Sequence, residues 1–186
     1  LAGYGVLMNS DLMLVRHFHP DEAGYFAQAA TIGRSVIFLP MPIAMALFPK
    51  VISSGLASAD SRRTLARALL MALGLIGSAV IMVWLLPWLP LRILFGVKEP
   101  SPESLALVRW VCLAMSPLGL TYLLLHFEMA QHRFEAVPWL IACALAYVGG
   151  VYLWHDTVLH IVAALGGAAL TSAIVFAVML VRHRPR

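Results

Sequence analysis

Asp11 and Arg34 are the two residues of this chain whose types and spacing could do chemistry inside long apolar segments. The sequence "HPDEAG" between the two segments contains residues that favour a turn and is centred near residue 21 or 22. A hairpin folded there brings position 11 opposite position 34, each about 15 Å from the turn at a helical rise of about 1.5 Å per residue. We therefore predict an ion pair between Asp11 and Arg34, with Asn9 or Ser35 available for the remaining hydrogen bonds.

A buried pair of this kind has two interpretations. In the first, the pair only holds two helices together, since buried ion pairs often do no more than specify packing. In the second, one partner faces a polar pathway. A guanidinium can bind phosphate in a bidentate fork, and a carboxylate can carry a coupling proton by gaining and losing its charge. The sequence leaves both interpretations open.

The composition places these residues in a membrane protein. The chain is 61% hydrophobic and 12% charged, with a mean hydropathy of +0.87, whereas about a quarter of the residues of a soluble domain are charged. Several stretches approach the roughly 20 apolar residues that a helix needs to cross a bilayer, and their continuous apolar character favours helices over barrel strands. The predicted fold is an all-α membrane protein, a single bundle of about six transmembrane helices. The predicted spans are approximately 1–18, 25–48, 65–94, 105–129, 137–154 and 159–181.

The orientation follows from the basic residues. Eight Lys and Arg residues lie in or beside the links that follow the second, fourth and sixth predicted spans, and four lie in or beside those that follow the first, third and fifth. Lys and Arg near the ends of spans are retained on the cytoplasmic side, so the C-terminal "RHRPR" is expected in the cytoplasm. The aromatic residues at the outer interface would then be Trp84, Trp88, Trp110, Tyr152 and Trp154. The basic residues are scattered at span ends, so no nucleic-acid partner is expected. The chain opens on Leu1 without a preceding basic region, and we expect further sequence before it.

Prolines mark the places where the spans are expected to break. Pro40 and Pro42 lie in the second predicted span, and Pro117 lies in the fourth. A proline removes a backbone donor and kinks a helix, and such breaks survive in membranes where neighbouring groups satisfy the freed carbonyls. These prolines indicate either static kinks for packing or a bend beside a buried polar site.

The remaining titratable residues are not expected to form a metal site. His17 and His19 flank a phenylalanine in the predicted turn, and a structural zinc site needs four ligands. The segment "HFEMAQH" has neither the order nor the spacing of the H-E-x-x-H zinc motif. Cys112 and Cys143 both fall within predicted spans and are interpreted as packing residues.

The first 50 residues resemble a known transporter family. The stretch "NSDLMLVRHFHPDEAGYFAQAATIGRSVIFLPMPIAMALFPKV" resembles the seventh and eighth transmembrane helices of polysaccharide-export flippases. These belong, with lipid-linked oligosaccharide flippases, to the superfamily of the MATE drug antiporters. The resemblance rests on Asp11 after the polar Asn9, on "EAGYFAQA", on "GR" at 33–34 and on "LFP" at 47–49. Beyond residue 50 the resemblance is limited to the helix spacing and to two short segments, "LFG" at 94–96 and "QHRF" at 131–134.

The resemblance implies that the chain is the C-terminal half of a MATE-like transporter with twelve or more helices, and that an N-terminal half is missing. It implies a bacterial inner-membrane protein that acts on an undecaprenyl-linked oligosaccharide for surface polysaccharide or lipopolysaccharide synthesis. Arg34 is the residue placed to engage the pyrophosphate of that substrate.

Four functions are compared on this basis, and the one disfavoured by the pair of Asp11 and Arg34 is a structural membrane subunit without its own pathway. The favoured one is a flippase that moves the lipid-linked oligosaccharide by alternating access around a midplane site. The alternative within transport is a MATE-like, cation-coupled drug antiporter, with Asp11 as the coupling residue for a proton or a sodium ion. A membrane enzyme acting on polyprenyl phosphate would need clustered acidic residues or histidines at one interface, but the 9 acidic residues are dispersed. We therefore expect a protein that is not an enzyme and has no cofactor.

The orientation can be tested by labelling. Single cysteines at Ser58 and at Pro102, in a background without Cys112 and Cys143, are treated with an impermeant thiol reagent outside intact cells. The cysteine at position 102 should react and the one at position 58 should not, because the basic residues retain the second loop inside. The reverse labelling pattern would overturn the orientation.

Overall fold

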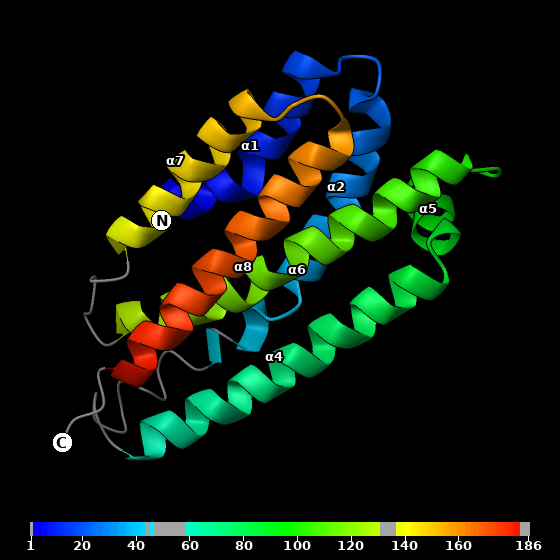
Figure 1. Ribbon diagram of the computed structural model, residues 1–186. Helices are drawn as coiled ribbons and strands as arrows, with labels where there is room; N and C mark the ends of the chain where they lie inside the picture. Colours follow the sequence, from blue (N-terminus) through cyan, green and yellow to red (C-terminus); the bar gives the residue numbers. More distant parts are fainter. Residues whose placement is uncertain (1, 44, 47–58, 131–136, 183–186) are drawn as a thin grey trace.

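The computed structural model describes residues 2–43, 45–46, 59–130 and 137–182 of the 186-residue chain. Within these ranges every regular element is a helix (Figure 1). The predicted all-α fold class is therefore confirmed for the described residues. The helices are α1 (Ala2–Phe18), α2 (Ala23–Phe38), α4 (Ala59–Leu85), α5 (Trp88–Phe95), α6 (Pro102–Ala130), α7 (Val137–Leu153) and α8 (Val158–Arg182).

Three of these helices are long and apolar enough to cross a membrane, which indicates a membrane-embedded protein. They are the segments Arg63–Leu85 of α4, Pro102–Met129 of α6 and Val158–Leu180 of α8. Helix α7 is a shorter apolar helix of 17 residues. Helices α1 and α2 have 17 and 16 residues and are not among these apolar helices, so the predicted spans 1–18 and 25–48 stay predictions.

The third predicted span is wrong as a single helix. Residues 65–94 were expected to be continuous, but α4 ends at Leu85 and the separate helix α5 begins at Trp88. The reason lies in Pro87 and Pro90, which have no backbone N–H and so cannot donate to the carbonyls four residues earlier. Two missing donors within one turn end the long helix.

The predicted break in the second span is confirmed. Helix α2 ends at Phe38, and helical backbone resumes at residues 41–43 and 45–46 after a turn that contains the buried Pro40. Pro42 cannot donate to the carbonyl of Phe38, so the two helical parts do not share a continuous hydrogen-bond ladder. The predicted end of this span at Phe48 and the labelling position Ser58 lie outside the described residues.

Helix α6, by contrast, continues through Pro117. This proline cannot donate to the Leu113 carbonyl, but the Ser116 hydroxyl donates to that carbonyl over 2.8 Å. One turn later, the Thr121 hydroxyl donates to the Pro117 carbonyl over 3.1 Å. A neighbouring side chain thus satisfies the carbonyl that the proline frees, which is how prolines are accommodated in membrane helices.

Helix α6 forms the centre of the bundle. It packs most extensively against α2 and α8, and α4 lies against a further side of it. In the most apolar stretch of α6, 61% is buried inside the protein, whereas the corresponding stretches of α4 and α8 are 22% and 33% buried. Small residues let the helices approach closely, since a Cβ added at Gly166 of α8 would lie 3.2 Å from the Cβ of Ala114 on α6. Helix α7 packs on the outside of α1 and α8 (Figure 1).

The aromatic residues predicted for the outer interface lie at one end of the bundle. Figure 1 places the end of α4, helix α5, the start of α6 and the end of α7 toward the same end, together with the α1–α2 turn. The five predicted aromatic side chains are all exposed. The rings of Trp84 and Trp110 meet edge to face with centroids 5.6 Å apart. The start of α4 and the end of α8 lie at the opposite end.

The close contact between α6 and α8 predicts different effects for two neighbouring glycines. Gly166→Val should lower the stability in detergent by about 1–3 kcal/mol, because the added Cβ alone lies 3.2 Å from the Ala114 Cβ and 3.4 Å from its Cα, which leaves no room for two more methyl groups. Gly167→Val is the matched control, since no atom lies within 4 Å of an added Cβ there. Thermal unfolding followed by circular dichroism measures both. Equal losses in the two variants would show that the close approach does not limit the packing.

Candidate functional site

The predicted ion pair between Asp11 and Arg34 is confirmed. The Nη2 of Arg34 donates to the Oδ1 of Asp11 over 2.7 Å, and its Nε donates to the backbone carbonyl of Met8 over 3.1 Å. The Asp11 side chain is 0% exposed, whereas that of Arg34 is 17% exposed. The pair therefore consists of a fully enclosed carboxylate and a guanidinium that reaches the surface. Nη1 of Arg34 has no hydrogen-bond partner among the described residues.

The α1–α2 hairpin sets the depth of this pair. Asp11 precedes the end of α1 by about 10 Å and Arg34 follows the start of α2 by about 17 Å, at about 1.5 Å per residue. The long arginine side chain bridges the difference and reaches along α1 as far as Met8. Counting residues outward from the predicted turn therefore identified the two partners correctly.

A second set of contacts fixes α1 beside α7. The ring of Phe18, at the end of α1, stacks on the His155 ring with centroids 4.1 Å apart. Nε2 of His19 donates to the His155 carbonyl over 2.7 Å. These contacts join the α1–α2 turn to the α7–α8 link and hold the two helices in register.

Tyr147 lies on α7, which packs against α1, and the residue is 2% exposed. Its hydroxyl has no hydrogen-bond partner among the described residues, and neither has the Oδ2 of Asp11. Buried polar atoms are normally paired, so these two oxygens are exceptions within the bundle. The sequence analysis missed Tyr147. The position of Tyr147 along its helix was a usable signal. The ends of α1 and α7 lie toward the same end of the bundle, and Tyr147 precedes the end of α7 by six residues while Asp11 precedes the end of α1 by seven.

The other residues predicted for the site do not join it. The Asn9 amide donates to the Gly5 carbonyl of its own helix, and the Ser35 hydroxyl donates to the Thr31 carbonyl. The expectation that Asn9 or Ser35 completes the hydrogen bonds of the pair is therefore wrong. Carbonyls one turn earlier are the nearest acceptors, and short side chains on a helix bond to them readily. The Met8 carbonyl takes the place expected for Asn9.

Asn9 nevertheless belongs to a set of exposed polar side chains on the hairpin, which lie among exposed apolar ones such as Met13 and Phe38. Asn9, Thr31 and Ser35 are exposed, and Arg34 reaches the surface beside Ser35. Helix α7 offers the contrast, because the exposed side chains within 137–151 are all apolar or glycine. A surface in contact with lipid should be apolar, and polar side chains at membrane depth usually face protein or a water-filled cavity. We call the face formed by Asn9, Thr31, Arg34 and Ser35 the hairpin polar face.

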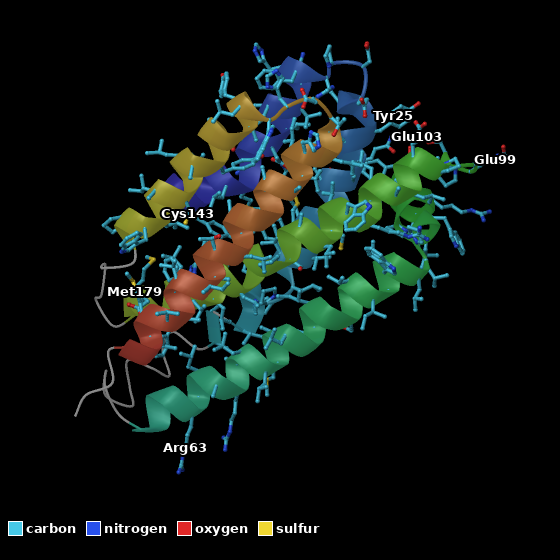
Figure 2. All side chains as sticks on the ribbon, viewed as in Figure 1. Tyr25, Arg63, Glu99, Glu103, Cys143 and Met179 are labelled. Carbon is cyan, nitrogen blue, oxygen red and sulfur yellow. The ribbon has the colours of Figure 1, made fainter. Side chains whose placement is uncertain are left out.

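The described residues contain no group of three or more His, Cys, Asp or Glu side chains that could hold a metal ion. Cys112 is buried and Cys143 is partly buried on α7 (Figure 2), and both are free thiols. His17 lies against Phe18, and His19 is engaged with the His155 carbonyl. These residues contribute to packing and to the helix ends.

No protein-family model, curated protein or solved structure matches the chain. The geometry of the pair and of the hairpin polar face is therefore the basis for the function.

The unequal burial of the two partners predicts unequal effects of removing them. Arg34→Gln should destabilise the fold by about 3–5 kcal/mol, because it leaves the enclosed Asp11 carboxylate without its partner. Asp11→Asn should cost less, because the remaining guanidinium already reaches the surface. The double variant should recover stability relative to Arg34→Gln. Thermal unfolding in detergent measures all three.

Arg16→Gln is the control, since it removes an exposed positive charge from the same helix as Asp11. It should leave the unfolding temperature nearly unchanged. Additive effects of Asp11→Asn and Arg34→Gln would show that the two residues are not energetically coupled.

Proposed function

We propose that this chain is one bundle of a membrane transporter and that the hairpin polar face lines its substrate pathway. All six long helices cross the bilayer in this proposal, and α5 lies at the outer end. The observation that carries it is Arg34, whose side chain is held by a fully buried carboxylate and yet is 17% exposed, with Nη1 unpaired among the described residues. A bundle that served only as a structural anchor would have no use for a charge fixed at that position.

The chemistry of Arg34 favours an anionic substrate. A guanidinium has five donors, and here Nε and Nη2 are engaged with Met8 and Asp11. The donors of Nη1 are left for a ligand, and charge-assisted hydrogen bonds to phosphate oxygens are strong where water is excluded. Asp11 cancels much of the positive charge, so the site suits a ligand that must bind and then leave.

The proposed substrate is an undecaprenyl-linked oligosaccharide, moved across the bacterial inner membrane for surface polysaccharide synthesis. This identification extends the resemblance of residues 9–51 to the polysaccharide-export flippases. The proposal includes a second bundle, the N-terminal half of the same transporter, that covers the hairpin polar face. The two bundles would rock around the site in alternating access. The C-terminus lies in the cytoplasm in this arrangement.

One observation favours the second candidate, a MATE-like antiporter coupled to a proton or a sodium ion. Oδ2 of Asp11 and the hydroxyl of Tyr147 are two buried oxygens without partners among the described residues. They provide a place where a coupling ion or proton could bind. Against this stands the 2.7 Å contact between Asp11 and Arg34, because the guanidinium already neutralises the carboxylate. Cation binding at Asp11 requires Arg34 to move away.

Export of surface polysaccharide by the full-length protein tests the proposal. The Asp11→Asn, Arg34→Gln double variant should fold but export poorly, since an amide fills the helix contact without binding phosphate as a guanidinium does. Arg34→Lys should fold nearly normally with reduced export, because it keeps the charge and loses the planar fork. Folded protein in the membrane is quantified in parallel.

Arg16→Gln again serves as the matched control and should export normally. Normal export by the folded double variant would remove the substrate-binding role from Arg34 and leave it a packing residue. Drug resistance that depends on the protein, together with unchanged polysaccharide export in its absence, would favour the antiporter.

A further inference from the structure

Helix α5 has the character of a helix at the membrane surface. It contains 8 residues, about 12 Å of helix, and so is far too short to cross a bilayer. Leu91 is 1% exposed and attaches α5 to the bundle, whereas Ile93 and Leu94 are 70% and 56% exposed. Trp88 and Phe95 are also exposed. These side chains are suited to the boundary between headgroups and acyl chains, where short amphipathic helices and tryptophans lie.

A basic recess adjoins this apolar surface. Arg92 of α5 and Lys98 of the following link line a recess of about 390 Å³. Gly96 brings the two cations together, because its left-handed φ of 67° turns the chain back at the end of α5. The backbone N–H groups of Gly96 and Val97 donate to the carbonyls of Arg92 and Leu91 and so fix this turn. The other lining residues are Trp88, Val97, Pro100 and Leu105.

The two cations have no neutralising partner in the part of the chain that the structure describes. Neither Arg92 nor Lys98 has a carboxylate within 4.0 Å among the described residues. Glu99 extends away from the helices at the tip of the α5–α6 link (Figure 2) and does not line the recess. The recess therefore has two positive charges, an apolar floor and exposed apolar side chains beside it.

We propose that this recess binds the phosphate of an anionic glycerophospholipid, in the leaflet at the α5 end of the bundle. Arg92 provides the fork and Lys98 a second positive charge for the phosphate oxygens, while the acyl chains lie along the exposed side chains of Ile93 and Leu94. A free phosphate ion would make no use of this apolar surface, so the ligand is the membrane lipid. The inference does not depend on the proposed transport function. That leaflet is the outer one in the orientation proposed above.

Lipid titration of the full-length protein in detergent, followed by native mass spectrometry, tests the site. The probes are dioleoylphosphatidylglycerol and dioleoylphosphatidylcholine, which share their acyl chains and differ in net charge. The protein should bind the anionic lipid more tightly. Arg92→Gln and Lys98→Gln should each weaken that binding roughly five-fold, the contribution expected for one basic residue near an anionic surface. Binding of the zwitterionic lipid should change little.

Two further variants keep the test specific. Arg63→Gln with Arg67→Gln removes two exposed charges near the start of α4, at the opposite end of the bundle (Figure 2), and should leave lipid binding unchanged. Exchanging the two cations, Arg92→Lys with Lys98→Arg, keeps the charge and should retain most of the binding. Equal affinity for the two lipids, or an equal loss in the Arg63 and Arg67 control, would overturn the proposal. Displacement of the anionic lipid by an equimolar amount of inorganic phosphate would also overturn it, since the acyl chains would then contribute nothing.

Discussion

The Asp11 carboxylate, fully enclosed among apolar helices, is the constraint on which the rest of this bundle depends. A buried charge is costly unless it is paired, so α1 must present Asp11 to a cation and α2 must present Arg34 where its guanidinium can reach that carboxylate. That requirement fixes the relative height of the two helices. The contacts of Phe18 and His19 with His155 then fix α7 against α1, and the opposite face of α2 packs on α6.

Much of this arrangement follows from the sequence, because hydropathy and turn position are local signals. The apolar runs predicted the helices, and counting outward from "HPDEAG" paired Asp11 with Arg34. The split between α4 and α5 was missed because Pro87 and Pro90 lie within a run whose hydropathy does not change. Asn9 was misassigned because hydropathy does not show that a carbonyl on its own helix is the nearer acceptor. Tyr147 was missed because its position depends on the packing of α7, a contact between residues distant in sequence.

The outer surface of the bundle differs in polarity from one helix to another. Helices α4 and α7 expose mainly apolar side chains, as a lipid-facing surface requires. The hairpin polar face exposes an amide, two hydroxyls and part of a guanidinium over a similar range of depth. Between them, α6 supplies the shared packing core, and the bond from Ser116 to the Leu113 carbonyl lets a proline remain in that core without interrupting the helix.

The separation of 23 residues between Asp11 and Arg34 also bears on how the protein is made. Both partners belong to one helical hairpin, so they can neutralise each other as soon as the second helix has left the ribosome. A charged residue at the centre of a lone inserted helix costs about 2.5–3.5 kcal/mol on insertion scales. A partner on a distant helix would leave that cost in place until the whole bundle had assembled. In the proposed arrangement, in which α1 and α2 both cross the bilayer, pairing neighbours in the chain lets Asp11 and Arg34 neutralise each other before any of the later helices has been synthesised.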